Sequence, residues 1–470
     1  MVPIARWLFA LLICPSAVYA GETTVQLLDL TRHWVGFLSL GMFVLAYLLV
    51  MCEEFTHLRK SKPVIVAAGI IWAAIGIEYA KHGLSPEAEA GLRHNLLEYA
   101  ELMLFLLVAM TYINSMNERC VFDALRAWLV RTGFGFRQLF WLTGSLAFII
   151  SPFADNLTTA LLMCAVVLAV GKGNHRFVSL SCINIVVGAN AGGAFSPFGD
   201  ITTLMVWQKG VVDFWTFFAL FVPSVVNFLV PAALMHFAVP DKKPSAAGDD
   251  VHLKRGARRI ILLFLLTICM AVAFHNYLGL PPVTGMMTGL GFLQLFGYFL
   301  KKTTGRDRVR RDRNGNLLQI GDVVPFDVFE GIARAEWDTL LFFYGVVMCV
   351  GGLGFIGYLH LLSHVMYATW GATQANVAVG VLSAFVDNIP VMFAVLSMEP
   401  DMPLGQWLLV TMTAGVGGSM LSIGSAAGVG LMGQARGSYT FFSHLKWSPA
   451  VALGYAASIY AHMLVNGRMF

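Results

Sequence analysis

Three aspartates occur inside long apolar stretches of this sequence, where carboxyl groups are rare. Asp155 lies in SPFADNLTTALL, Asp200 in GGAFSPFGDITT and Asp387 in FVDNIPVMFAVL. A carboxylate at membrane depth is energetically costly, so such residues usually mark ion pathways or substrate sites. The alternative that each aspartate only caps an opened helix end stays open, most of all for Asp387.

Neutral side chains that carry oxygen atoms cluster around these aspartates along the sequence. They are Asn156, Thr159, Asn190, Ser196, Thr202, Thr203, Asn388, Ser422 and Ser425. Carboxylate, amide, hydroxyl and main-chain carbonyl oxygens are the ligands that a small alkali cation requires. No thiolate or imidazole joins the set, so a zinc or copper site is not expected. Some of the hydroxyls are expected only to hydrogen-bond back to their own helix.

Burial of a carboxylic acid favours its neutral form, so a proton and a cation compete for the same oxygens. If the binding unit faces the two sides of a membrane alternately, this competition couples cation flow to proton flow in the opposite direction. The sequence therefore predicts cation/proton exchange at Asp155 and Asp200, with Asp387 in a secondary role.

The composition indicates how these residues are positioned. Of the 470 residues, 57% are hydrophobic and only 12% are charged, and the mean hydropathy is +0.71. Soluble domains carry about a quarter charged residues. Because apolar runs of membrane length recur along the chain, we expect an all-α, polytopic helical membrane protein. No phosphate-binding loop, nucleophile triad or hydrolase motif occurs, so we expect neither an enzyme nor a cofactor. Residues 1–20 read as a signal peptide or a first transmembrane helix.

Most of the 31 Lys and Arg residues lie in alternate connecting segments, which we assign to the cytoplasm. Basic segments flank residues 138–171 on both sides, and neither flank of 374–398 contains Lys or Arg. Each of these two spans must therefore enter and leave the membrane on one face. We predict two re-entrant hairpins that open to opposite sides.

The order of elements then repeats with inverted topology. The first repeat covers 33–238, with a broken helix at 177–207, and the second covers 260–465, with a broken helix at 404–433. Residues 239–259 form a cytoplasmic linker, and 301–337 form a basic cytoplasmic loop.

Two pairs of motifs support this duplication. FADNLTTALL matches FVDNIPVMFAVL, which aligns Asp155 with Asp387, and GGAFSPFGD matches GGSMLSIGS, which aligns Asp200 with Ser425. Inverted repeats with broken helices are typical of secondary transporters, whose substrate sites lie near the midplane.

The runs SPFADNLTTALL, GANAGGAFSPFGDITTLMVW and SAFVDNIPV closely resemble the NhaD-type sodium/proton antiporters of the ion-transporter superfamily. The resemblance implies a scaffold domain, a transport domain that moves like an elevator, a homodimer in the bacterial inner membrane, and a role in pH and sodium homeostasis. It also implies that Na⁺ and Li⁺ are the transported ions. The implied ion-site positions are Asp155, Asn156, Asn190, Asp200 and Thr202, and, on weaker matches, Asn388 and Ser425.

Two other functions remain as alternatives. One is a sodium- or proton-coupled di- or tricarboxylate transporter of the same fold, whose relatives carry neutral Ser-Asn-Thr hairpin tips. The tips here read Ala-Asp-Asn-Leu-Thr and Val-Asp-Asn-Ile-Pro, and their negative charge favours a cation. The other alternative is a structural or assembly protein, which predicts no ion flux.

Two further features concern regulation and the membrane surface. His94 and Glu98 share one helix face, and this pair could tune the pH response because histidine titrates near neutrality. Packing at a helix end is an equal alternative for His94, whereas Glu98 is expected to pair with a transport-domain group. The basic run KKTTGRDRVRRDR, which begins at Lys301, fits contact with the anionic lipid bilayer better than nucleic-acid binding.

Overall fold

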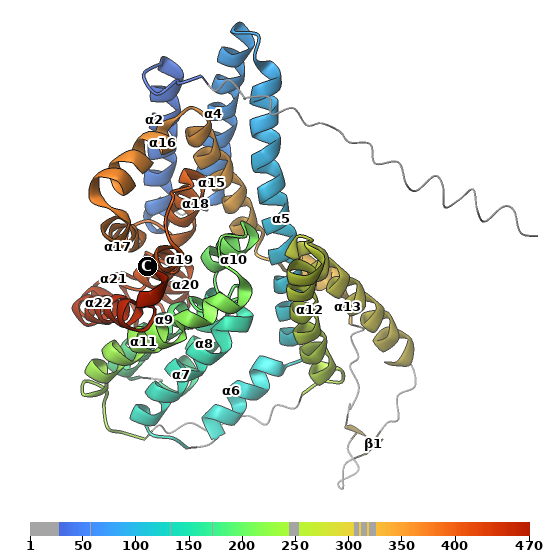
Figure 1. The fold of residues 1–470 in the computed structure, drawn as a ribbon. Coiled ribbons are helices and arrows are strands. Elements are labelled where there is room, and N and C mark those ends of the chain that lie inside the picture. Colours follow the sequence, from blue (N-terminus) through green and yellow to red (C-terminus); the bar gives the residue numbers. More distant parts are fainter. Residues whose placement is uncertain are drawn as a thin grey trace, which may run out of the picture.

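The computed structural model describes residues 28–56, 58–131, 133–171, 173–243, 253–304, 310–311, 317–318 and 326–470. Helices dominate these residues (Figure 1). Two short strands, β1 (Arg310–Arg311) and β2 (Leu317–Leu318), pair antiparallel with Arg310 opposite Leu318. The predicted signal peptide or first helix at 1–20 lies outside the described residues.

The helices of the first half are α2 (Trp34–Met51), α3 (Glu53–Thr56), α4 (Ser61–Lys81), α5 (Ser85–Glu118), α6 (Val121–Arg131), α7 (Phe136–Ala154), α8 (Asn156–Val170), α9 (His175–Gly193), α10 (Ile201–Gln208), η1 (Phe214–Leu220) and α11 (Phe221–His236). Those of the second half are α12 (Ala257–Leu278), α13 (Pro282–Thr304), α14 (Val328–Ala333), α15 (Trp337–Phe355), α16 (Tyr358–Ser363), η2 (His364–Trp370), α17 (Ala372–Ser383), α18 (Asn388–Met398), α19 (Leu404–Gly417), α20 (Ala426–Gln434), α21 (Phe441–Leu445), α22 (Ser448–Val465) and η3 (Gly467–Met469).

Eight helical segments in the described part of the chain are long and apolar enough to cross a bilayer. The protein is therefore a multi-pass helical membrane protein. The helix α5 begins at Ser85, well before the apolar part of its sequence, because the polar run SPEAEAGLRHN also favours a helix, with Pro86 in its first turn.

The helices contact one another in two groups. In the first group, α4 packs against α2 and α15, and the long helix α5 packs against α4, α12, α13, α14 and α15. In the second group, α9 packs against α7, α8, α11 and α19, and α11 packs against α22. Figure 1 shows α5 passing between α4 and α12, with α7, α8, α9 and α11 gathered to one side of it. The main contacts between the groups run through α18 and α6: α18 packs against α15, and α6 packs against both α5 and α8.

The chain leaves helical geometry at four places that lie near α9, α18 and α19. Asp155 alone separates α7 from α8 and adopts a left-handed φ of +50°, which is strained for a residue with a side chain. Residues 194–200 separate α9 from α10, residues 384–387 separate α17 from α18, and residues 418–425 separate α19 from α20.

Close backbone approach explains the glycine pairs at the two longest interruptions. A Cβ atom at Gly193 would lie 2.7 Å from the carbonyl oxygen of Gly199, and one at Gly418 would overlap the carbonyl oxygen of Gly424. Only glycine allows the main chain to fold back on itself at this separation. These glycines therefore shape the loops that carry Asp200 and Ser425.

Candidate cation-binding site

All four interruptions place a polar residue at the N-cap of the following helix. Asp155, Asp200, Asp387 and Ser425 occupy the N-cap positions of α8, α10, α18 and α20 respectively, although the Asp387 side chain makes no capping hydrogen bond. The Asp155 carboxylate accepts hydrogen bonds from the main-chain nitrogen of Thr158 at 2.8 Å and from its hydroxyl at 2.9 Å. Capping thus engages both carboxylate oxygens of Asp155. For Asp200 it engages only Oδ1, which accepts from the nitrogen of Thr202 at 3.2 Å.

The second carboxylate oxygen of Asp200 joins the two halves of the chain. Asn156 donates to Asp200 Oδ2 at 3.2 Å, and Asn388 donates to the same oxygen at 2.9 Å. Asp200 is only 4% exposed, so these hydrogen bonds form away from bulk water. Asn156 at the start of α8 and Asn388 at the start of α18 therefore bond to one buried carboxylate.

Asn190 extends this polar cluster to the loop that precedes α20. Its Oδ1 accepts from Asn156 at 3.0 Å, and its Nδ2 lies 2.8 Å from the hydroxyl of Ser419 and 3.0 Å from that of Ser425. The cluster consequently contains residues from α8, α9, α18 and the loop before α20, together with Asp200.

Three predicted ligand hydroxyls have no hydrogen-bond partner among the described residues. They belong to Thr159, Thr202 and Ser422, and all three are buried. A Cβ atom at Gly415 on α19 would lie 3.6 Å from Asp200 Oδ2 and 3.7 Å from Thr202 Oγ1. Glycine at this position leaves space beside two oxygens that are both suited to a hard cation.

Ser196 and Thr203 have a different local role, because their hydroxyls donate to main-chain carbonyls. Ser196 donates to the carbonyl oxygen of Pro152 at 2.9 Å. Thr203 donates to the carbonyl oxygens of Ser196 at 2.8 Å and Asp200 at 2.7 Å. Ser196 Oγ also accepts from the main-chain nitrogen of Phe198 at 3.3 Å, so these bonds hold the interruption before α10 in shape.

The predicted site residues line two different cavities. A cavity of about 150 Å³ is lined by Asp155, Asn156, Asp200 and Asn388. A larger one of about 740 Å³ is lined by Asp387 and Ser425. Asp387 thus lines a different cavity from Asp200. Asn388, the residue after Asp387, nevertheless donates a hydrogen bond to Asp200.

Sequence reasoning missed three residues near the cluster: Lys60, Gly415 and Ser419. Lys60 Nζ lies 3.8 Å from Asp387 Oδ2. The repeat alignment contained a signal for Gly415, because the register that matches Gly199 with Gly424 also matches Asn190 with Gly415. No local pattern distinguishes Lys60 from its basic neighbours.

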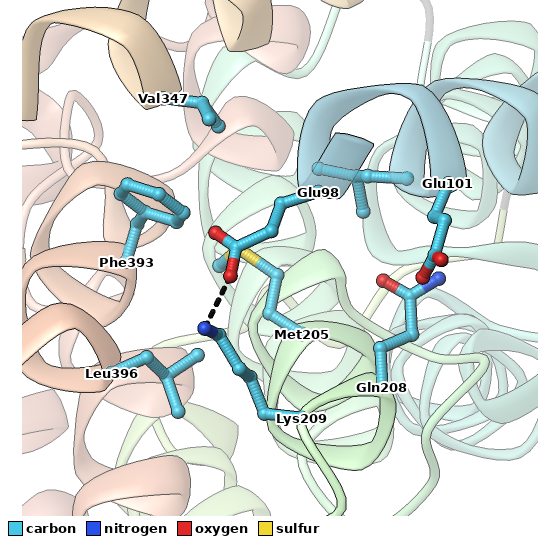
Figure 2. Close-up of a pocket in the computed structure, with 9 residues that line it drawn as sticks. Glu98, Glu101, Met205, Gln208, Lys209, Val347, Phe393 and Leu396 are labelled. Carbon is cyan, nitrogen blue, oxygen red and sulfur yellow. Dashed lines mark ion pairs between the residues drawn. The ribbon is translucent and has the colours of Figure 1, made fainter. Parts of the chain in front are cut away.

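A further pocket, of about 130 Å³, lies at the far end of α10 (Figure 2). Glu98 of α5 forms an ion pair there with Lys209, the C-cap residue of α10, and its Oε1 lies 3.2 Å from His94 Nε2. In Figure 2, Glu98 points toward Lys209, and Glu101 lies beside Gln208. Glu98 therefore connects α5 to the end of α10.

Comparison with known proteins shows to which family the chain belongs. Residues 30–415 match a family model described as "Citrate transporter". A protein named Na(+)/H(+) antiporter NhaD from Alkalimonas amylolytica is 60% identical over 99% of this chain and 98% of its own length. A protein of the same name from Vibrio cholerae is 62% identical over 95% of both chains.

A more distant relative extends the same description to plants. Sodium/proton antiporter 1 of Arabidopsis thaliana is 30% identical over 91% of this chain and 72% of its own length. The named relatives are transporters rather than enzymes. Given the extent of these matches, the chain belongs to the NhaD family of Na⁺/H⁺ antiporters, within the wider group that the citrate transporter model describes.

Proposed function

We propose that this protein exchanges Na⁺ for H⁺ across the membrane and that Asp200 is the centre of the exchange site. One observation carries the assignment of the site. The Asp200 carboxylate is buried among neutral amides and hydroxyls, and no basic side chain in the described part of the chain pairs with it. A buried carboxylate without a protein counter-charge requires a proton or a bound cation.

The cluster contains the donors and acceptors that both occupants need. With a proton on Asp200, the amide groups of Asn156 and Asn388 complete the hydrogen bonding of the carboxyl group. For Na⁺, rotation of these two side-chain amides turns their oxygens toward the ion, and Thr202 Oγ1 adds a further oxygen. Asp155, which lines the same cavity, supplies a second negative charge.

We further propose that the two halves are inverted repeats, with hairpins α7/α8 and α17/α18 and broken helices α9/α10 and α19/α20. Matching contacts support this proposal. Ser151 donates to the carbonyl oxygen of Ala189 at 2.6 Å, and its counterpart Ser383 donates to that of Ala414 at 2.7 Å. Asp200 adopts φ −143° and ψ 149°, and its counterpart Ser425 adopts φ −145° and ψ 150°.

Alternating access in this proposal is an elevator movement of one helix group against the other. The scaffold is the group around α4, α5 and α15, and the transport unit is the group around α9. The cavity around Asp200 is also lined by Arg334 and Glu336. The distribution of basic residues assigns these two positions to the cytoplasmic side, so we propose that Asp200 faces the cytoplasm in this conformation.

The same proposal includes the sequence-based predictions on repeat boundaries, oligomeric state, location, Li⁺ transport and pH response. The repeats are 33–238 and 260–465, linked by 239–259, and the protein is a homodimer in a bacterial inner membrane. Li⁺ is expected to replace Na⁺ because it binds the same hard oxygen ligands. Glu98 and His94 modulate the pH response from the outer end of α10.

Anion transport is the second candidate, because the matching family model is described as "Citrate transporter". Two carboxylates that line one cavity disfavour it, since a di- or tricarboxylate would meet repulsion from both Asp155 and Asp200. The NhaD relatives at 60% identity and above also support cation exchange.

Everted membrane vesicles test the proposal directly. A pH-sensitive dye should report proton movement out of acidified vesicles on addition of Na⁺ or Li⁺, with a smaller response to K⁺. Vesicles without the protein are the control. Uptake of labelled dicarboxylate with no Na⁺-dependent proton movement would instead support the anion carrier, and the absence of both would support a structural role.

A further inference from the structure

Lys60 brings a positive charge from the scaffold to the tip of the second hairpin. It precedes α4, and its Nζ lies 3.8 Å from Asp387 Oδ2 and 4.6 Å from the centroid of the Phe342 ring. The Lys60 side chain is 19% exposed and that of Asp387 is 16% exposed. The pair is therefore largely shielded from solvent, where screening by salt is weaker than at the surface.

This pairing distinguishes Asp387 from the other two aspartates. Within the described residues, Asp155 and Asp200 bond only to neutral groups, whereas Asp387 has a lysine partner. The other carboxylate oxygen of Asp387 is buried and has no hydrogen-bond partner there. The positive partner of Asp387 is thus the ammonium group of Lys60.

The hairpin tip connects this ion pair to the exchange site. Asn388 follows Asp387 directly and donates to Asp200 Oδ2 at 2.9 Å. Lys60 also lines both cavities, the one that contains Asp200 and the one that contains Asp387. A change in charge at Lys60 or Asp387 therefore changes the electrostatic potential at Asp200. The two sites are connected through Asn388, and Lys60 lines the cavity that contains Asp200.

We propose that Lys60 is a tethered cation that occupies Asp387 and thereby sets the Na⁺ affinity of the Asp200 site. This inference rests on the proposed function. Lys60 and Asp387 form a nearly neutral unit beside the site, so Asp387 is a charge partner of Lys60 and not a Na⁺ ligand in this conformation. Because Lys60 belongs to the scaffold and Asp387 to the transport unit, elevator movement separates the pair and changes the potential at Asp200.

The signs of the expected effects are opposite for the two partners. Lys60→Gln leaves an unpaired negative charge near Asp200, so the apparent KM for Na⁺ falls when it is measured at alkaline pH, where a proton no longer competes with Na⁺ for Asp200. Asp387→Asn leaves an unpaired positive charge, so the apparent KM rises. One uncompensated unit charge in the wall of the same cavity, at an effective dielectric constant near 20, changes an affinity on the order of tenfold. The double variant restores near-neutrality, and its KM returns toward the wild-type value.

Everted vesicles that contain wild type, each single variant and the double variant provide the test. Na⁺-dependent protection of the purified proteins against thermal unfolding measures affinity independently of turnover. Lys62→Gln is the matched control, because Lys62 lies two positions away in α4 and is exposed. Lys60→Arg should keep the pair and a KM close to wild type. Opposite shifts that cancel in the double variant support the proposal, because purely structural damage would shift both single variants in the same direction.

Three results would overturn it: an unchanged KM in Lys60→Gln, shifts of the same sign in both single variants, or loss of folding in Lys60→Arg as well as Lys60→Gln. The wild-type vesicles separate this inference from the proposed function. Absence of Na⁺-driven proton movement in wild type refutes the exchange function, whereas normal exchange with an unaltered Lys60→Gln variant refutes only the role of Lys60.

Discussion

Gly415 gives a selective way to perturb the space beside Asp200. The substitution Gly415→Ala adds a methyl group 3.6 Å from Asp200 Oδ2, 3.7 Å from Thr202 Oγ1 and 3.8 Å from the Cβ atom of Ala194. These are ordinary van der Waals separations, so the neighbours need not move. Alanine also favours the interior of α19 by up to about 1 kcal/mol over glycine. We expect the variant to fold with wild-type stability or better.

The same methyl group fills the space in which a cation would contact Asp200 Oδ2 and Thr202 Oγ1 together. Hard cations of this size lie about 2.4 Å from their oxygen ligands, so the ion must move away from the methyl group and weaken one of the two contacts. Loss of one polar interaction with a charged group costs about 1.5–3 kcal/mol. We therefore expect the apparent KM for Na⁺ to rise roughly 10- to 100-fold, with a smaller effect for Li⁺.

Proton movement in everted vesicles measures this KM, and thermal unfolding of the purified variant measures its stability. Gly417→Ala is an informative contrast on the same helix, because its Cβ atom would overlap the main-chain carbonyl of Gly380, and this variant should fail to fold. If Gly415→Ala folds and retains the wild-type KM for Na⁺, the cation does not bind between Asp200 and Thr202, and the reasoning is refuted.

Three other predictions concern topology and pH. Cysteines introduced at Gly173 and Gln374 should react with impermeant reagents from the cytoplasm and from the outside respectively, and labelling of both from one side would contradict the inverted repeats. His94→Ala should shift the pH profile of exchange or weaken activity without changing ion selectivity, because His94 contacts Glu98, whereas an unchanged profile would assign it a structural role. Burial lowers the pKa of His444, which lies outside the membrane spans in α21, to about 4, although the carbonyl of Ser419 opposes this shift. The unfolded chain then binds more protons between pH 6.5 and 4, so stability should fall as pH falls through this window, by up to about 3 kcal/mol, and His444→Gln should flatten the dependence of the melting temperature on pH.

The positions of the membrane helices could be predicted from sequence because each depends on local composition. Apolar runs between basic loops lie close to the observed helices, and the broken helices predicted at 177–207 and 404–433 contain the interruptions before α10 and α20. The exception was the start of α5, where the polar residues after Ser85 continue the helix beyond the apolar core. Hydropathy does not detect such an extension, because a polar sequence also forms a helix when its propensity is high.

The grouping of the candidate site was only partly predictable. The motifs identified Asp155, Asp200, Asn156 and Asn388, because carboxylates and amides stand out in apolar surroundings. Sequence reasoning did not predict that Asn388 bonds to Asp200, 188 positions away, or that Lys60 pairs with Asp387. Such contacts depend on how the helices pack, and a single sequence contains no local pattern for them.

The exchange activity of Asp200→Asn tests the central claim most directly. The substitution retains the size of the side chain but removes both its charge and its exchangeable proton, while Asn156, Asn388 and Thr202 still offer hydrogen-bonding partners. The variant should insert in the membrane in wild-type amounts and show no Na⁺-dependent proton movement in everted vesicles. If Asp200→Asn exchanges Na⁺ for H⁺ at the wild-type rate, competition between a proton and a cation at this carboxylate is not the mechanism.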